Sequence, residues 1–224
     1  MITKFGSSTN GLGDLLLLTS ICKFFPNKFT IQIPKNKEKY SILFWGLAEV
    51  EITDDINILP DIGNGHYATR KLRNFFSNPL VLDNRPLVLY SDLESEEWAN
   101  NFLQDKKNPI IFTPNCSKQW ASIRNMPKKL ALDFLNSSEE AILMINSENE
   151  FESNHKIKLI DLDLKKTICL FRKVGFYVGC NTGDEHLATA VGCRTFVYQP
   201  QHPSFNKEEW NYKHRNNTYY NFQI

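Results

Sequence analysis

The sequence has no excess of charge of either sign. Its 224 residues include 26 Lys and Arg and 25 Asp and Glu, which gives a formal net charge of +1. Neither half of the chain forms a basic or an acidic tail. Proteins that hold a nucleic acid by its phosphates cluster Lys and Arg on one face. The composition therefore argues mildly against a nucleic-acid partner.

Long apolar segments are also missing. No uninterrupted run of about 18 apolar residues is present, so no membrane-spanning helix is expected. The first residues, Met1–Gly6, have neither an apolar signal core nor a cleavage site, and we expect a cytoplasmic protein. Apolar residues make up 42% and aromatic residues 12% of the chain, which excludes a disordered polypeptide. The length suits one large domain or two small ones.

The cysteines lack the spacing of a disulfide framework or a zinc site. There are five of them and no CxxC pair: Cys22, Cys116, Cys169, Cys180 and Cys193. An odd number without paired spacing argues against both kinds of site. We expect reduced thiols, buried or half-buried, and no metal ion.

What the sequence does contain is a regular alternation of short apolar runs with helical stretches. This alternation is typical of an α/β fold with parallel strands. Strands are expected at residues 2–5, 29–34, 50–52, 86–90, 110–113, 141–145, 157–162, 176–179 and 194–198, and helices at 15–25, 37–47, 68–76, 94–103, 127–135, 167–174 and 185–191. The tail from Gln199 onward shows no convincing periodicity.

A charged segment near the middle of the chain predicts a domain boundary. It covers residues 105–109 and ends in Pro109, which disfavours a helix before it. Two α/β units are therefore predicted, residues 1–107 and 108–224. Each has a loop at the carboxyl end of a strand, which is where open parallel sheets bind ligands.

The strongest candidate for a ligand site is the turn between the strand at 176–179 and the following helix. The backbone amides of Thr182, Gly183 and Asp184 lie at the expected helix start, where free amides and the helix dipole favour an anion such as phosphate. Gly183 permits a diphosphate to approach closely. His186, in the first helical turn, could contact the phosphate or a sugar. On spacing alone, an ordinary turn with Thr182 or Asp184 as N-cap is the more common arrangement.

A second candidate is the sequence Gly11-Leu-Gly-Asp14 near the amino terminus. Asp14, just after Gly13 and at the start of an apolar helix, would be kept ionised by the helix dipole. Such a carboxylate can act as a general base toward a hydroxyl, although it could equally only cap the helix. The segment matches neither a Walker loop nor a GxGxxG motif.

A third candidate is the polar loop after the strand at 110–113. It carries Ser117, Lys118 and Arg124. A cation that follows a strand end can neutralise a leaving diphosphate. The alternative is a solvated surface loop.

Together these segments resemble glycosyltransferase family 9, the ADP-heptose:lipopolysaccharide heptosyltransferases and their relatives. The stretch from Val178 to Tyr198 is similar to the family signature of a strand, Asp-Thr-Gly, two variable residues, His-Leu-Ala, a helix to Gly and a final strand. Leu12-Gly-Asp14, an apolar helix and Phe25-Pro26 resemble its amino-terminal hallmark. The segment 124–127 is similar to its Lys/Arg-x-Trp-Pro turn, and Glu150 falls where the family often has an acidic residue near the ribose.

The resemblance implies a GT-B fold, with two Rossmann-like domains and a cleft between them. A nucleotide-diphosphate sugar, by family an ADP-sugar, would bind mainly to the carboxyl-terminal domain, and no cofactor or metal would be needed. Asp14 becomes the candidate general base, and Lys118 or Arg124, with the Thr182 and Gly183 amides, would hold the diphosphate. The family generally inverts the anomeric centre.

The family's default acceptor is a carbohydrate or glycolipid of surface polysaccharide or lipopolysaccharide synthesis. A glycolipid acceptor would bring the protein into peripheral contact with the inner face of the membrane.

The chain departs from the family pattern at several positions. Asn181 stands where the family has Asp, Asp184 where it usually has a small or apolar residue or Pro, and Met126 where it has Trp. The chain is also short for the family, mainly on the acceptor side. Two alternatives therefore remain open: a catalytically silent nucleotide-sugar-binding module, or another GT-B-like enzyme such as a sugar-nucleotide epimerase.

Overall fold

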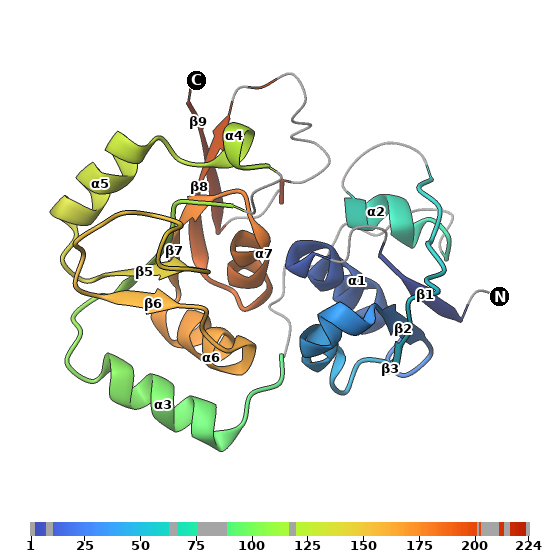
Figure 1. Cartoon of the computed structure of the whole chain (residues 1–224). Helices are drawn as coiled ribbons and strands as arrows, with labels where there is room; N and C mark the ends of the chain where they lie inside the picture. Colours follow the sequence, from blue (N-terminus) through green and yellow to red (C-terminus); the bar gives the residue numbers. More distant parts are fainter. Residues whose placement is uncertain are drawn as a thin grey trace. The chain divides into compact units, whose positions relative to one another are not determined.

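A computed structural model of the chain (Figure 1) divides it into two compact units. Unit 1 comprises Met1–Tyr90 and Asn206–His214, and unit 2 comprises Ser91–Phe205 and Arg215–Ile224. The structure describes residues 3–7, 11–62, 67–75, 89–116, 120–200, 202, 211–212 and 216–222. Within these residues, no helix combines the length and the apolar character needed to cross a membrane.

The division between the units lies earlier in the chain than the boundary expected near residue 107. The helix α3 (Leu93–Leu103) belongs to unit 2 because it packs on α6 (Leu164–Val174). Ion pairs fix this contact, since Lys165 lies 2.9 Å from Asp92 and Glu96 lies 2.9 Å from Lys173. The charged segment at 105–109 is therefore a loop inside unit 2 and not a linker.

Unit 1 is built on three parallel strands in the order β1-β2-β3: β1 (Lys4–Gly6), β2 (Thr30–Ile33) and β3 (Glu49–Ile52). The crossover helix α1 (Leu12–Phe24) buries apolar side chains around most of its circumference, as its sequence predicted. On the free side of β1, Gly6 forms a parallel bridge to Ile58, and its amide donates to the Asn57 carbonyl at 2.8 Å. This arrangement is the beginning of a Rossmann-like half.

Three elements expected in unit 1 differ from the prediction. The helix expected at 37–47 is the 3₁₀ helix η1 (Lys35–Phe44), in which only Leu43 and Phe44 are buried. So few buried contacts do not supply the packing on which a regular α-helix depends. The helix expected at 68–76 is α2 (Tyr67–Leu72). Of the strand expected at 86–90, Leu89 and Tyr90 are described and do not form a strand, and the rest lies outside the described residues.

Unit 2 contains six parallel strands in the order β6-β5-β4-β7-β8-β9. They are β4 (Ile110–Thr113), β5 (Ala141–Ile145), β6 (Lys158–Ile160), β7 (Phe176–Cys180), β8 (Arg194–Pro200) and β9 (Asn217–Phe222). The chain runs outward from β4 through β5 and β6, then returns to β7 and runs outward on the other side. The strand order therefore reverses between β4 and β7, which makes their carboxyl ends the expected place for a ligand.

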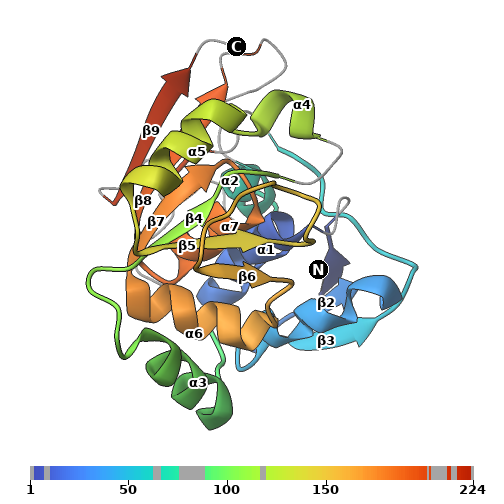
Figure 2. The same cartoon turned by 60° about the vertical axis from the view of Figure 1, so that its left-hand side comes forward.

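Helices cover both faces of this sheet (Figure 2). On one face α5 (Lys128–Ser137) packs through Phe134, whose ring centroid lies 4.5 Å from that of Phe112 on β4. On the other face α6 packs through Phe171 against Tyr177 of β7, beside α7 (Gly183–Ala190). A short helix, α4 (Ala121–Arg124), precedes α5. Pro127, expected as the first residue of a helix, is instead the N-cap of α5.

The parallel sheets of both units, with helices between their strands, confirm the predicted α/β class.

Candidate functional site

The loop between β7 and α7 leaves the sheet at the reversal of strand order. Thr182 is the N-cap of α7, and its hydroxyl accepts a hydrogen bond from the Asp184 amide at 3.1 Å. Of the three amides expected to be available for a ligand, that of Asp184 is thus occupied. Those of Thr182 and Gly183 donate to no acceptor within the described part of the chain. The turn is both a capped helix start and a place where two amides can meet an anion.

The Asp184 carboxyl group is turned onto the neighbouring strand. Its Oδ2 accepts a hydrogen bond from the Thr113 hydroxyl at 3.2 Å, at the carboxyl end of β4. Burial raises the pKa of Asp184 to about 6, although the Thr113 hydrogen bond opposes the rise and the charge of Glu150 adds to it. A carboxyl group held in this way can take up a proton when an anion binds beside it.

The Asn181 side chain, expected to contact substrate, is buried and paired. It donates a hydrogen bond through Nδ2 to Oε2 of Glu185, which is itself 0% exposed. Tyr219 on β9 donates to the other Glu185 oxygen at 2.8 Å. Glu185 and Tyr219 were missed in the sequence because they meet only through β9, a strand without a periodic signal. The structure therefore assigns Asn181 to the support of α7.

Burial raises the pKa of Glu185 to about 8, against the opposing effects of the Tyr219 hydrogen bond, the Arg124 charge and the Asn181 hydrogen bond. The folded protein holds this proton more tightly than the unfolded chain, whose carboxyl titrates near 4.5. The contribution of Glu185 to stability is therefore fully present below the unfolded pKa and is lost as the pH rises toward 8.

For the wild type we expect the free energy of unfolding to fall by roughly 2–4 kcal/mol between pH 5 and pH 8. Glu185→Gln should lose most of this slope, because the amide does not titrate. Urea denaturation at four pH values measures the change in the free energy of unfolding with pH. The exposed Glu94→Gln serves as the control and should keep the wild-type slope. An unchanged slope in Glu185→Gln would show that the buried carboxyl is not the titrating group.

A cavity of about 310 Å³ lies between the segments that follow β4 and β5 and is of a size to hold a nucleoside. Its lining combines amide, carboxylate and apolar side chains: Asn115, Asn125, Met126, Lys128, Asn149, Glu150, Phe151 and Glu152. The Glu150 carboxylate accepts hydrogen bonds from the backbone and side chain of Asn146, and its carbonyl accepts from Asn115 at 2.7 Å. These bonds fix the loop that carries Glu150, so the carboxylate is held at the cavity wall.

Arg124 ends α4 and brings a positive charge to the same part of unit 2. Its guanidinium carbon lies 4.9 Å from the ring centroid of Trp120, and its charge lowers the pKa values of both Cys116 and Glu185 against the larger rise caused by burial. Ser117 and Lys118 lie outside the described residues. His186 is 6% exposed in the first turn of α7, where its amide donates to the Thr182 carbonyl at 3.4 Å.

Asp14 lies in unit 1, in the first turn of α1. Gly11 is the N-cap of this helix, and Gly13 is buried. A Cβ atom on Gly11 would lie 3.1 Å from Oδ2 of Asp14, so the carboxylate is folded over the amino-terminal end of α1. The helix dipole there favours the ionised form.

The structure thus brings together Thr182, Gly183, Asp184, Arg124 and Glu150 within unit 2, at one end of its sheet. Among the residues that the structure describes, no three His, Cys, Asp or Glu side chains are grouped to hold a metal ion.

Three solved structures resemble the chain over nearly its whole length. The family 9 glycosyl transferase of Veillonella parvula has a TM-score of 0.72 at 11% identity and covers 98% of this chain and 86% of its own. The chain has the fold of the GT-B heptosyltransferases. ADP-heptose lps heptosyltransferase II of E. coli has a TM-score of 0.62 at 10% identity, and the match covers 98% of this chain and 90% of the E. coli chain.

The E. coli heptosyltransferase WaaC, solved with ADP, has a TM-score of 0.63 at 12% identity, with 99% and 93% covered. No protein-family model and no curated protein sequence matches the chain. The heptosyltransferase-like fold expected from the sequence motifs is confirmed, and at these identities the likeness is one of fold.

Proposed function

We propose that the protein is a glycosyltransferase that moves a sugar from a nucleotide-diphosphate sugar to an acceptor hydroxyl. The observation that carries the proposal is the arrangement at the carboxyl end of the unit 2 sheet. There, two helix-start amides lie at the reversal of strand order, and a cation and a carboxylate-lined cavity lie in the segments that follow β4 and β5. The amides can bind the phosphates, the cation can neutralise their charge, and the carboxylate can accept hydrogen bonds from a ribose.

The donor in this proposal is an ADP-sugar. The amides of Thr182 and Gly183 receive the diphosphate, Arg124 and Lys118 neutralise its charge as it leaves, and Glu150 accepts hydrogen bonds from the ribose hydroxyls. Support comes from the fold shared with WaaC, a heptosyltransferase solved with ADP. Asp184 lies beside the phosphates and accepts a hydrogen bond from the Thr113 hydroxyl. His186 supports the start of α7.

Asp14 is the general base in this proposal. The carboxylate removes the proton from the acceptor hydroxyl as its oxygen attacks the anomeric carbon, and the bond from that carbon to the diphosphate breaks. Because cations and amides stabilise the leaving diphosphate, the reaction needs no metal ion. Direct displacement inverts the configuration at the anomeric carbon.

The remaining assignments follow the family resemblance of the sequence motifs. Unit 1 holds a carbohydrate or glycolipid acceptor and unit 2 holds the donor. A heptose as the transferred sugar, and surface polysaccharide or lipopolysaccharide synthesis as the pathway, are the first choices to test. A glycolipid acceptor would place the protein on the inner face of a membrane.

Calorimetric titration with nucleoside diphosphates tests the donor site. The wild type should bind ADP, and Glu150→Gln should bind it about tenfold more weakly, because the hydrogen bonds from the ribose lose a charged acceptor. Gln keeps an oxygen for the Asn146 amide, so the loop should stay in place. The exposed Glu139→Gln serves as a control and should bind like the wild type. If no nucleoside diphosphate binds, the proposal fails.

A further inference from the structure

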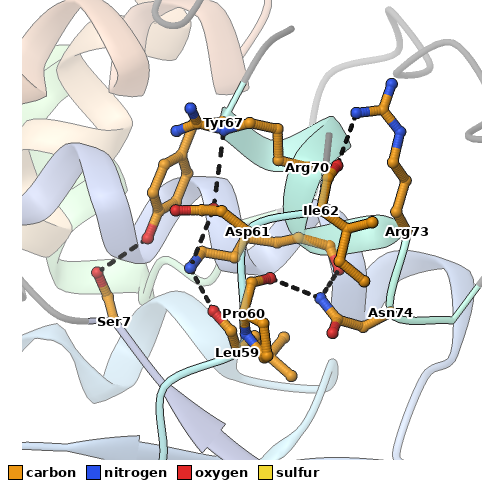
Figure 3. A network of polar contacts seen from close by, with 10 residues as sticks. Ser7, Leu59, Pro60, Asp61, Ile62, Tyr67, Arg70, Arg73 and Asn74 are labelled. Atoms are coloured by element: carbon orange, nitrogen blue, oxygen red, sulfur yellow. Dashed lines mark hydrogen bonds and ion pairs between the residues drawn. The ribbon is translucent and has the colours of Figure 1, made fainter. Parts of the chain in front are cut away.

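A second network of polar side chains lies in unit 1, between α2 and the segment 59–62 (Figure 3). Its centre is Tyr67 of α2, which is 6% exposed and packs on Leu17 of α1. Leu17 is three residues after Asp14, so both side chains lie on one face of the helix. The Tyr67 hydroxyl oxygen lies 3.5 Å from that of Ser7, a fully buried residue that directly follows β1.

Two cations hold the Tyr67 ring in place. Lys71 Nζ lies 5.2 Å and the Arg70 guanidinium carbon 5.8 Å from the ring centroid, within the range of a cation–π interaction. Both cations pair with Asp61, at 3.2 Å for Lys71 and 3.7 Å for Arg70. The Lys71 side chain is only 4% exposed and also donates to the Leu59 carbonyl. A buried ammonium needs such partners, so the position of the ring is tightly determined.

The segment 59–62 is fastened to α2 by further bonds. The Asn74 amide donates to the Pro60 carbonyl at 2.8 Å, and Arg73 donates to the Ile62 carbonyl at 2.7 Å. Figure 3 shows these contacts converging on one side of α2 while the Tyr67 hydroxyl points to Ser7. Together these contacts fix the phenol group of Tyr67, which has no role in the proposed binding of the donor.

The phenol remains a hydrogen-bond donor at neutral pH. Burial raises the pKa of Tyr67, the Ser7 hydrogen bond opposes the rise, the charges of Asp14 and Asp61 add to it, and Arg70 opposes it. Asp14 lies one helical turn before Leu17, on which Tyr67 packs, so its carboxylate belongs to the charged surroundings of the phenol. A protonated hydroxyl in a buried position near a carboxylate stabilises the charged form of that carboxylate and fixes its orientation.

We propose that Tyr67, together with Ser7, is a positioning residue that orients Asp14 toward the acceptor hydroxyl. This inference rests on the proposed function, because it assigns a task only if Asp14 is the base. Arg70, Lys71 and Asp61 act one step further away, by holding the Tyr67 ring. The phenol exchanges no proton with substrate in the reaction.

Steady-state kinetics of Tyr67→Phe test the inference. Loss of the hydroxyl should lower kcat about ten- to a hundredfold and leave the KM for the donor within twofold of the wild type. The acid limb of the pH profile of kcat should move to higher pH, because Asp14 loses a group that favours its ionised form. Tyr40→Phe, which removes a phenol hydroxyl from η1 in the same unit, should change none of these quantities.

Ser7→Ala provides an independent route if Tyr67→Phe folds poorly, and it should move the acid limb in the same direction. A Tyr67→Phe or Ser7→Ala enzyme that is folded and retains the wild-type kcat and pH profile would overturn the inference while leaving the proposed function intact. Absence of any sugar transfer by the wild type would instead overturn the proposed function, and the inference with it.

Discussion

Asp14→Asn is expected to abolish sugar transfer and to leave nucleotide binding unchanged. The amide has the shape of the carboxylate but cannot accept the proton of an acceptor hydroxyl. Loss of a general base lowers the rate about 10²- to 10⁴-fold. The residues proposed to bind the donor all belong to unit 2, whereas Asp14 belongs to unit 1. Turnover with a saturating donor and titration with ADP measure the two effects separately.

The control for this variant is Asp54→Asn, which removes an exposed carboxylate from the same unit. It should match the wild type in both assays. If Asp14→Asn retains wild-type turnover, Asp14 is not the base. If the variant instead loses ADP binding while turnover per bound donor is unchanged, Asp14 belongs to the donor site.

Gly179→Ala should destabilise unit 2 by about 3 kcal/mol, because the added carbon has no room. A Cβ atom there would lie 2.5 Å from the Thr113 carbonyl oxygen and 2.5 Å from the Tyr177 hydroxyl oxygen. Tyr177 is fully buried, and its hydroxyl donates to the Cys180 carbonyl at 3.2 Å. Movement of the Thr113 carbonyl would separate β4 from β7, and movement of the buried Tyr177 ring would break its bond to Cys180. Urea denaturation followed by circular dichroism gives the loss.

Gly175→Ala is the matched control, because it adds the same atom to the same unit. Gly175 ends α6 with φ at +67°, and a Cβ atom there meets nothing within 4 Å. Only the left-handed backbone is penalised, by about 1 kcal/mol. Equal losses in the two variants would show that the contacts around Gly179 relax and that the close approach of β4 to β7 does not require a glycine.

The parts of the fold that the sequence predicted well are those with strong local signals. The helix α1 follows from the apolar run Leu15–Leu18 and the further apolar residues after it, and β5 from the apolar stretch Ala141–Ile145. The turn at Thr182 combines a good N-cap with a glycine, so α7 could be placed from a few residues. These signals depend only on neighbours in the chain.

The parts that were missed depend on distant neighbours. The strand β9 has the sequence NTYYNF, which carries no clear alternation and is ordered by its parallel pairing with β8. Without β9, the partner of Glu185 could not be found. The unit boundary was misplaced for the same reason, because the ion pairs that join α3 to α6 connect Asp92 and Glu96 with residues more than 70 positions away.

The candidate site shows a similar division. The amides at Thr182 and Gly183 were predicted from a local motif, and Glu150 was predicted from the family resemblance. The pairing of Asn181 with Glu185, the turn of Asp184 toward Thr113, and the Tyr67–Ser7 contact required the folded chain. Asn181 and Asp184, which depart from the family pattern, are both accommodated by contacts that the structure supplies.

The central claim is that the protein binds a nucleotide-diphosphate sugar at the carboxyl end of the unit 2 sheet. Native mass spectrometry after mixing the protein with equal amounts of ADP-, GDP-, UDP- and CDP-sugars tests it most directly. We expect the wild type to retain the intact ADP-sugar and Glu150→Gln to retain much less of it. Retention of none of the four donors by the folded wild type would contradict the claim.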